Sequence, residues 1–336
     1  MASGTKTIVR RLACGSGLIR TVSRFGPSGA VILAYHSVQN CPELYADSIV
    51  LGITHDTRVF QRQMQLVATK FHPVTIDEIE QFLNNGKKLP PNSVAITFDD
   101  GYADNYAIVA PILDRFEIRA SFYLTESLIG TRIVPWFCRL RHAFAKTNRS
   151  EWPSREGRNW SLASREERNN AFLAACNLCS AMSGTDCSNT VQEIENILEI
   201  EQLSGDGMMM DWDQAKALLN AGHSVGCHTS THPNVAHVSG TVAQAEILRA
   251  KYDIETKLES SVLHFSYPHP ALDPNWNPDT RTLTREAGYR TAVTTCAGPV
   301  REGDDVLALR RVAAPTSEDE FQWRLERAFL RRSFLA

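Results

Sequence analysis

The sequence lacks the features that would place it in several large classes of protein. No run of about 18 apolar residues occurs, so a transmembrane helix is not expected. Basic residues are not in excess, since the net charge is −3, and this argues against a nucleic-acid partner. No internal repeat or low-complexity tract is present. The 336 residues, 43% hydrophobic and 22% charged, have the composition of an ordinary globular protein.

The eight cysteines lack the spacing of a zinc finger. Only Cys176 and Cys179 form a Cys-x-x-Cys pair, in a stretch with helical character and without a second pair. We therefore expect mostly buried free thiols in a reducing compartment. The N-terminus also lacks the apolar core of a signal peptide, because Arg10 and Arg11 interrupt it. These absences predict a cytoplasmic location.

The first 42 residues contain no acid, and basic and apolar residues alternate between positions 6 and 24. We treat residues 1–29 as a basic amphipathic segment. One interpretation is peripheral contact of residues 6–24 with an anionic membrane face. The alternative is a helix that packs on the protein and turns its basic face to solvent.

One stretch organises the rest of the chain. The apolar, β-branched run of residues 94–98 ends in Asp99, Asp100 and Gly101. Such a run is typical of a buried strand in a parallel sheet, and residues 103–116 then have helical character. Ligands of α/β folds bind at the carboxyl ends of strands, so the two carboxylates are candidates for chemistry. A plain Asp-Asp-Gly turn is the alternative.

A second short strand ends in His-x-x-x-His, formed by His228 and His232. This spacing lets two imidazoles converge on one ion if the segment makes a helical turn. One aspartate and two histidines make a facial metal triad with open positions for water and substrate. Together, the two strand ends indicate a metal site formed by His228, His232 and one of the two adjacent aspartates.

These motifs resemble those of a known family. Thr97-Phe98-Asp99-Asp100-Gly101 and His228-Thr229-Ser230-Thr231-His232-Pro233 are similar to the first two motifs of the polysaccharide deacetylases, carbohydrate esterase family 4, which share the NodB homology domain. The resemblance runs roughly from residue 31 to residue 311. It implies an α/β fold, a distorted (β/α)7-type barrel, and removal of N-acetyl groups from amino sugars.

The resemblance also implies roles for single residues. Asp100, His228 and His232 would hold one divalent cation, most simply Zn²⁺, with Co²⁺, Mn²⁺ and Ni²⁺ as alternatives. Asp99 would be the general base for a metal-activated water that attacks the amide carbonyl. The substrate and its developing oxyanion would lie against Tyr267, Pro268 and His269.

The sequence departs from the common family pattern at two points. No histidine follows His269, although many members place the general acid near the C-terminus. His36, at the end of the first predicted strand, resembles the first-strand histidine of the poly-β-1,6-N-acetylglucosamine deacetylases, and we predict it as the acid. Many members also carry a base-orienting arginine where this chain has Ser266. Arg310 or Arg311, after a predicted strand at residues 307–309, would supply that charge.

The alternation of strands and helices predicts about seven strands in a small barrel spanning residues 30–316. Residues 134–205 break the rhythm and are expected to form a helical insertion, either a lid over the site or a peripheral extension. A long helix is predicted at residues 242–258. Capping pairs are expected at Asp211 with Gln214 and at Ser317 with Glu320, the latter opening a closing helix at residues 317–336.

The sequence therefore predicts a metal-dependent N-deacetylase whose partner is an N-acetylated glycan, in a polysaccharide or in an oligosaccharide or lipid-linked precursor. Hydrolysis of another non-peptide C–N bond in a small amide is one alternative. A catalytically inactive glycan-binding protein is the other, and Asp99 argues against it because binding alone needs no base. The glycan, the native metal and the oligomeric state do not follow from the sequence.

Overall fold

Seven parallel strands close into a barrel in the computed structural model, which describes residues 28–40, 53–269 and 271–329. Closure is made by β1, which pairs in parallel with both β5 and β13. The strands of the ring are, in spatial order, β1 (Gly29–Tyr35), β5 (Ser93–Phe98), β6 (Ala120–Leu124), β9 (Ser224–Cys227), β10 (His264–Ser266), β11 (Thr291–Ala297) and β13 (Leu309–Ala313). The predicted (β/α)7-type barrel is confirmed.

Burial explains why these segments form the ring. Every residue of β5 is buried, as expected of a strand covered on both faces.

Because β1 lies between β5 and β13, the first and last strands of the barrel are neighbours. Short strands extend the ring or pair outside it: β2 (Ser37–Gln39) with β3 (Thr54–Asp56), β4 (His72–Pro73) with β5, and β12 (Val300–Arg301) with β1.

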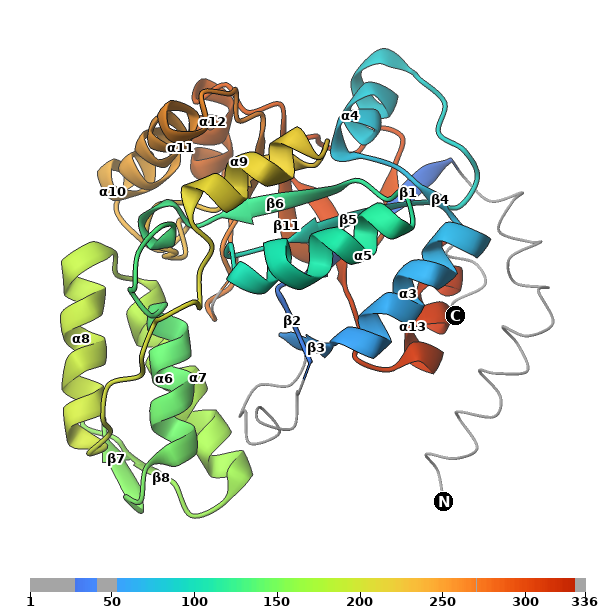
Figure 1. The fold of residues 1–336 in the computed structure, drawn as a ribbon. Coiled ribbons are helices and arrows are strands. Elements are labelled where there is room, and N and C mark those ends of the chain that lie inside the picture. Colours follow the sequence, from blue (N-terminus) through green and yellow to red (C-terminus); the bar gives the residue numbers. More distant parts are fainter. Residues whose placement is uncertain (1–27, 41–52, 270, 330–336) are drawn as a thin grey trace.

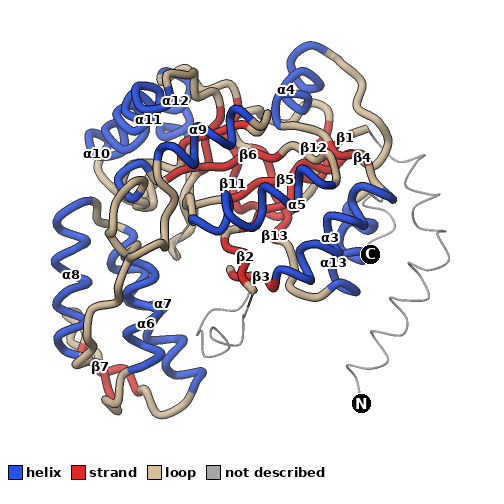
Figure 2. The backbone as a smooth tube through the Cα atoms, viewed as in Figure 1, coloured by secondary structure: helices blue, strands red, loops and turns tan. Residues whose placement is uncertain are grey.

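Helices surround the barrel and cover its outer face (Figures 1 and 2). They are α3 (Thr57–Lys70), α4 (Ile76–Asn85), α5 (Ala110–Arg115), α9 (Trp212–Asn220), α10 (Gly240–Gln244), α11 (Ala250–Leu258), α12 (Pro278–Glu286) and α13 (Glu318–Ala328). Two π-helical turns, η2 (Asn105–Val109) and η4 (Ala245–Arg249), run directly into α5 and α11. The predicted helix at 242–258 is thus continuous but contains a π turn.

The structure corrects two local predictions. The strand predicted at residues 307–309 is β13, which begins at Leu309 and contains both arginines, because a turn at Asp305–Ala308 precedes it. Ser317 occupies the N-cap position of α13 but makes no side-chain cap hydrogen bond, so the predicted pair with Glu320 is wrong. The pair of Asp211 and Gln214 is confirmed as a capping box of α9.

Residues 134–205 form a helical group with its own hydrophobic core, which lies beside the barrel (Figure 1). It enters from the short 3-10 turn η3 (Glu126–Leu128) that follows β6. Its elements are α6 (Trp136–Lys146), the hairpin of β7 (Glu151–Pro153) and β8 (Asn159–Ser161), α7 (Arg165–Ser180) and α8 (Gly184–Ile197). The core also includes Tyr102, which follows β5, and Met209, so the insertion packs against loops of the barrel.

The basic segment predicted at residues 6–24 lies outside the described residues, as does the end of the C-terminal segment beyond residue 329. None of the helices in the described part of the chain has the length and apolar character needed to cross a membrane. The six cysteines that the structure describes are free thiols, and four of them are buried.

Candidate active site

The two aspartates stand where β5 ends. Asp100 adopts a left-handed backbone conformation, with φ at 76°, and Gly101 follows with φ at 90°. A Cβ atom on Gly101 would lie 2.7 Å from the side chain of Ile129, so the tight turn requires glycine. Left-handed backbone is unusual for a non-glycine residue and is concentrated at functional sites. The chain returning from the insertion holds this turn, since Met210 donates its backbone N–H to the Gly101 carbonyl.

The His-x-x-x-His segment is an irregular bend and not the helical turn that the spacing suggested. Thr229 and His232 have φ values of 66° and 63°, so both adopt a left-handed backbone conformation within the motif. The Thr229 hydroxyl accepts a hydrogen bond from the backbone N–H of His232 at 3.0 Å. Left-handed residues therefore bring the two imidazoles together, with ring centroids 4.8 Å apart.

Asp100, His228 and His232, which we call the Asp-His-His cluster, have potential ligand atoms that all lie within 4.8 Å of one another. Asp100 Oδ1 is 3.5 Å from His228 Nε2 and 3.4 Å from His232 Nε2. All three residues are buried, and Asp100 Oδ1 has no hydrogen-bond partner. A buried carboxylate oxygen without a donor is costly unless a cation binds it.

The electrostatics of the cluster also fit a cation. Burial, followed by the adjacent Asp99 carboxylate, raises the pKa of Asp100 to about 8. Burial lowers the pKa of His228 and, more strongly, that of His232, so both imidazoles are neutral. His228 Nδ1 lies 2.7 Å from the Ser266 carbonyl, and donation there leaves the Nε2 lone pair free. Neutral imidazoles and a carboxylate short of positive charge form a suitable donor set for a divalent metal.

Asp99 is held by Arg311 in a buried, two-bond ion pair. Arg311 Nη1 donates to Asp99 Oδ1 at 2.9 Å, and Nη2 donates to Oδ2 at 2.7 Å. Burial alone would raise the pKa of Asp99, but the guanidinium charge of Arg311 outweighs it and holds that pKa far below its usual range. Both oxygens are fixed by this fork.

The guanidinium of Arg311 is bonded on every side. Its Nε donates to the Thr294 carbonyl, Nη1 also reaches the Thr97 hydroxyl, and Nη2 donates to Ser266 Oγ at 3.1 Å. Arg310, its neighbour on β13, instead pairs with Asp304 at 2.9 Å and stays partly exposed. Of the two arginines predicted beside Asp99, the structure therefore brings only Arg311 to it.

His36 follows β1 directly and lies close to Asp99. The backbone N–H of Asp99 donates to the Tyr35 carbonyl, and the His36 carbonyl accepts from the Asn105 side chain. Burial lowers the pKa of His36 to about 4, although the Asp99 carboxylate works in the opposite direction. The imidazole is therefore neutral in the free protein at pH 7.

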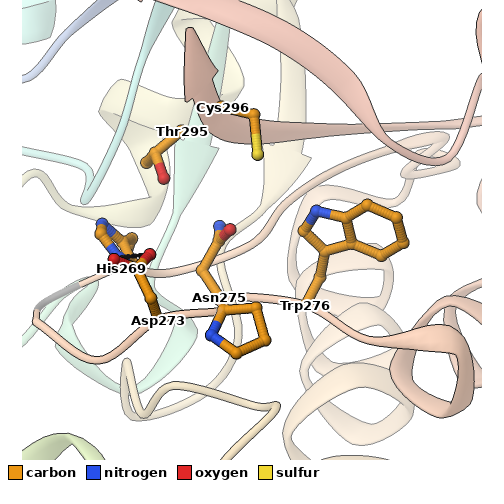
Figure 3. Close-up of a pocket in the computed structure, with 7 residues that line it drawn as sticks. His269, Asp273, Asn275, Trp276, Thr295 and Cys296 are labelled. Atoms are coloured by element: carbon orange, nitrogen blue, oxygen red, sulfur yellow. Dashed lines mark hydrogen bonds and ion pairs between the residues drawn. The ribbon is translucent and has the colours of Figure 1, made fainter.

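The segment predicted to line the substrate divides into two parts. The Tyr267 side chain points into the layer between sheet and helices, where its hydroxyl donates to Thr284, so its ring does not face the cluster. Pro268 is buried, and its nitrogen carries no hydrogen to donate. His269 alone reaches a cavity of about 510 Å³, which it lines with Asp273 and Trp276 (Figure 3). Its Nε2 lies 2.9 Å from Asp273 Oδ1.

Two sets of contacts at the site were not predicted residue by residue from the sequence. The insertion covers His232: the Phe137 ring lies 4.6 Å from the imidazole centroid, and Trp136 Nε1 donates to the His232 carbonyl. Glu246 of η4 is buried and accepts from the backbone N–H groups of Ser230 and Thr231 at 2.9 and 2.8 Å. Both act on the His-x-x-x-His bend, and neither leaves a sequence signal beyond aromatic residues and an ordinary helical acid.

Comparisons with known proteins agree with this geometry. The model of the polysaccharide deacetylase family matches residues 86–292. The poly-β-1,6-N-acetyl-D-glucosamine N-deacetylase of Escherichia coli K12 is 33% identical over 105 residues. That match covers 31% of this chain and 15% of the bacterial enzyme, so it spans only a small part of this relative's length.

Solved structures match over most of the chain. The Streptococcus pyogenes deacetylase PplD has a TM-score of 0.60 at 17% identity, covering 91% of this chain and all of that one. IcaB from Ammonifex degensii has a TM-score of 0.58 at 18% identity, covering 90% and 98%. At such identities these neighbours show the fold alone. Since the family model covers more than half of the sequence, the chain belongs to the polysaccharide deacetylase family.

Proposed function

We propose that this protein is a metal-dependent hydrolase that removes N-acetyl groups from amino sugars of a glycan. The observation that carries the proposal is the buried Asp-His-His cluster with Asp99 beside it, held by Arg311. A base, a metal site and a charge that orients the base occur together at the carboxyl ends of the barrel strands. A protein that only binds glycans needs none of the three.

Asp100, His228 and His232 would hold one divalent cation, with Zn²⁺ as the simplest choice for two imidazoles and one carboxylate. Such an ion polarises an amide carbonyl and lowers the pKa of a bound water. The unsatisfied Asp100 Oδ1 supports this assignment. Co²⁺, Mn²⁺ and Ni²⁺ remain alternatives, since the same donors bind each of them.

Asp99 would accept the proton of the attacking water. Because both carboxylate oxygens already accept hydrogen bonds from Arg311, the base is ionised and its orientation is fixed before substrate arrives. The same contacts make it a weak base, so we expect proton transfer to be driven by acidification of the water and not by a high pKa of Asp99. Arg311 is a positioning residue in this scheme.

His36 would protonate the amine as the C–N bond breaks, giving a free amino sugar and acetate. Its low pKa means that it must gain a proton within the reaction cycle. The negative charge of Asp99 favours the protonated imidazole, so a proton taken from water can be relayed to the leaving nitrogen.

The backbone N–H of His269 would support the developing oxyanion, and its cavity would hold a sugar against Trp276. Arg310, paired with Asp304, is not part of this proposal.

The experiment combines metal content with product release. Protein purified with Zn²⁺ should contain one ion per chain and release acetate from N-acetylglucosamine oligosaccharides. Asp100→Ala should lose both the metal and the activity, whereas Asp99→Asn should keep the metal and lose acetate release.

Each alternative function has its own outcome in this experiment. Metal binding with acetate released only from small non-sugar amides would indicate a different C–N hydrolase. Glycan binding that is unchanged in Asp99→Asn, without acetate release from any compound, would indicate an inactive binding protein. Either result would overturn the proposal.

A further inference from the structure

The two histidines of the Asp-His-His cluster are oriented in different ways. His228 Nδ1 lies 2.7 Å from the Ser266 carbonyl, and this hydrogen bond fixes the direction of its ring. His232 Nδ1 is buried and has no hydrogen-bond partner in any other described residue. A histidine that binds a metal ordinarily donates a hydrogen bond from its second ring nitrogen, which aims the first. The ring of His232 therefore needs another means of orientation.

The backbone of the His-x-x-x-His bend is fixed, but this does not set the direction of the His232 ring. The backbone N–H of His232 donates to Thr229 Oγ1 at 3.0 Å. The Glu246 carboxylate accepts from the N–H groups of Ser230 and Thr231, which lie between the two histidines. These contacts place the Cα–Cβ bond of His232 but leave its two side-chain torsions open. Packing against the imidazole must select among the remaining rotamers.

Two aromatic side chains at the start of α6 pack around the His232 imidazole. The Phe137 ring centroid lies 4.6 Å from the imidazole centroid, and the Trp136 ring lies 6.3 Å from it. The two aromatic rings meet each other edge to face, with centroids 5.6 Å apart. Trp136 Nε1 also donates to the His232 carbonyl at 3.3 Å. All three residues are buried, so a change of the imidazole rotamer would displace a packed ring.

The other two helices of the insertion hold the chain on both sides of His232. Thr231 Oγ1 accepts from the backbone N–H of Gly184, the first residue of α8, at 3.2 Å. Asn234 donates its backbone N–H to the carbonyl of Ser180, the last residue of α7, at 2.8 Å. The insertion therefore contacts the segment 231–234 through all three of its helices.

We infer that Phe137 and Trp136 are positioning residues for His232, and that the insertion at residues 134–205 is a fixed part of the metal site. The inference rests on the proposed function, since His232 is one of the proposed metal ligands. Phe137 holds the imidazole by its ring, and Trp136 holds the carbonyl of the same residue by its N–H. An insertion that opened as a lid would break both contacts, so it must stay in place while metal is bound.

The test measures zinc affinity by competition with a chromogenic indicator, together with thermal melts of the zinc-free protein. Phe137→Leu removes the ring but keeps an apolar side chain. It should weaken zinc binding about 10- to 100-fold, as expected when a group that orients a metal ligand is lost. Trp136→Phe removes the N–H donor but keeps an aromatic ring, and it should weaken zinc binding about 3- to 10-fold, the range for one hydrogen bond.

Phe172→Leu and Trp152→Phe are the matched controls. Both side chains are buried in the hydrophobic core of the same insertion, where they pack against Phe144. The control variants should lower the melting temperature of the zinc-free protein and leave its zinc affinity unchanged. An equal loss of affinity in Phe137→Leu and Phe172→Leu would show that the insertion acts only through overall stability, and would overturn the inference. Unchanged affinity in Phe137→Leu would overturn it too.

Cobalt gives a readout that depends on neither stability nor turnover. The visible absorption of bound Co²⁺ reports the arrangement of its ligands. The spectrum should shift in Co²⁺-loaded Phe137→Leu and match the wild type in Phe172→Leu, and a spectrum unchanged in both would contradict the positioning role. Wild-type protein that binds neither ion would overturn both the proposed function and this inference. Bound metal without acetate release would overturn the hydrolase activity alone, because the affinities would still decide the positioning role.

Discussion

Ser266 and Arg311 meet inside the barrel, where Arg311 Nη2 donates a hydrogen bond to Ser266 Oγ at 3.1 Å. Many members of the family carry an arginine at the position of Ser266, which lies on β10. In this chain the small side chain of β10 leaves room for a guanidinium from β13, which then reaches Asp99. The charge beside the proposed base is thus present but comes from a different strand.

We expect Arg311→Lys to lower kcat about 10- to 100-fold, because an ammonium group cannot replace the two-bond fork that fixes Asp99. Metal content should stay at the wild-type level, since Arg311 does not touch the Asp-His-His cluster. Acetate release and bound zinc, measured on the same samples, check this. Arg310→Lys is the matched control and should retain wild-type turnover, because its pair with Asp304 lies outside the site.

Moving the arginine from position 311 on β13 to position 266 on β10 tests the relationship between Ser266 and Arg311 directly. The double substitution Ser266→Arg with Arg311→Ser should regain part of the activity that Arg311→Ser alone loses. Its guanidinium would start from β10 and approach the same carboxylate. The wild type, the single variants Ser266→Arg and Arg311→Ser, and the double variant form a complete double-mutant cycle. A double variant that is no better than Arg311→Ser would show that the direction of approach, and not only the charge, matters.

His36→Gln should lower kcat strongly, by about 100- to 10,000-fold if the imidazole supplies general acid catalysis. Zinc content should not change, because His36 is not in the cluster. Substrates with a better leaving group, such as an N-acetyl aryl amine, should be affected much less. Normal turnover of sugar substrates in this variant would remove His36 from the mechanism.

Glu246→Gln should weaken zinc binding about 10- to 100-fold, the range seen when groups that support metal ligands are lost. The Glu246 carboxylate accepts three hydrogen bonds from Ser230 and Thr231, between the two histidines, and the amide can satisfy fewer of them. Competition with a zinc indicator measures the change. Glu255→Gln on the same helical stretch is the control, and an equal loss there would indicate a general destabilisation.

His223 should make the fold less stable in mild acid. Burial lowers its pKa from 6.5 to about 4, and Asp114 only partly opposes this. The unfolded chain binds the proton more readily, so the free energy of unfolding should fall as pH decreases from 6.5 to 4, by on the order of 2 kcal/mol. His223→Asn, whose amide oxygen can accept from the Ala120 N–H as Nδ1 does, should flatten this slope in pH-dependent thermal melts. An unchanged slope would contradict this assignment.

The residues of the candidate site could be predicted from sequence because they follow strands. A β-branched run that ends in Asp99 and Asp100, and a strand that ends in His228, place their side chains at one end of a parallel barrel whatever the details of its closure. Capping signals such as Asp211 with Gln214 are equally local, and the structure agrees with that pair. Strand patterns and capping pairs involve residues that are close together in the chain, so they can be seen in the sequence itself.

The contacts between strands depended on the tertiary structure. Arg310 and Arg311 are adjacent on β13, so their side chains point to opposite faces and only one of them faces the barrel interior. Which of the two does so depends on where the strand begins, and the predicted strand began too early. Trp136 and Glu246 reach the His-x-x-x-His bend from two helices, through packing that no local pattern encodes. Local sequence patterns specify which groups stand at the strand ends. Closure of the ring brings particular groups together, because side chains of segments far apart in the chain become neighbours only when β1 lies between β5 and β13.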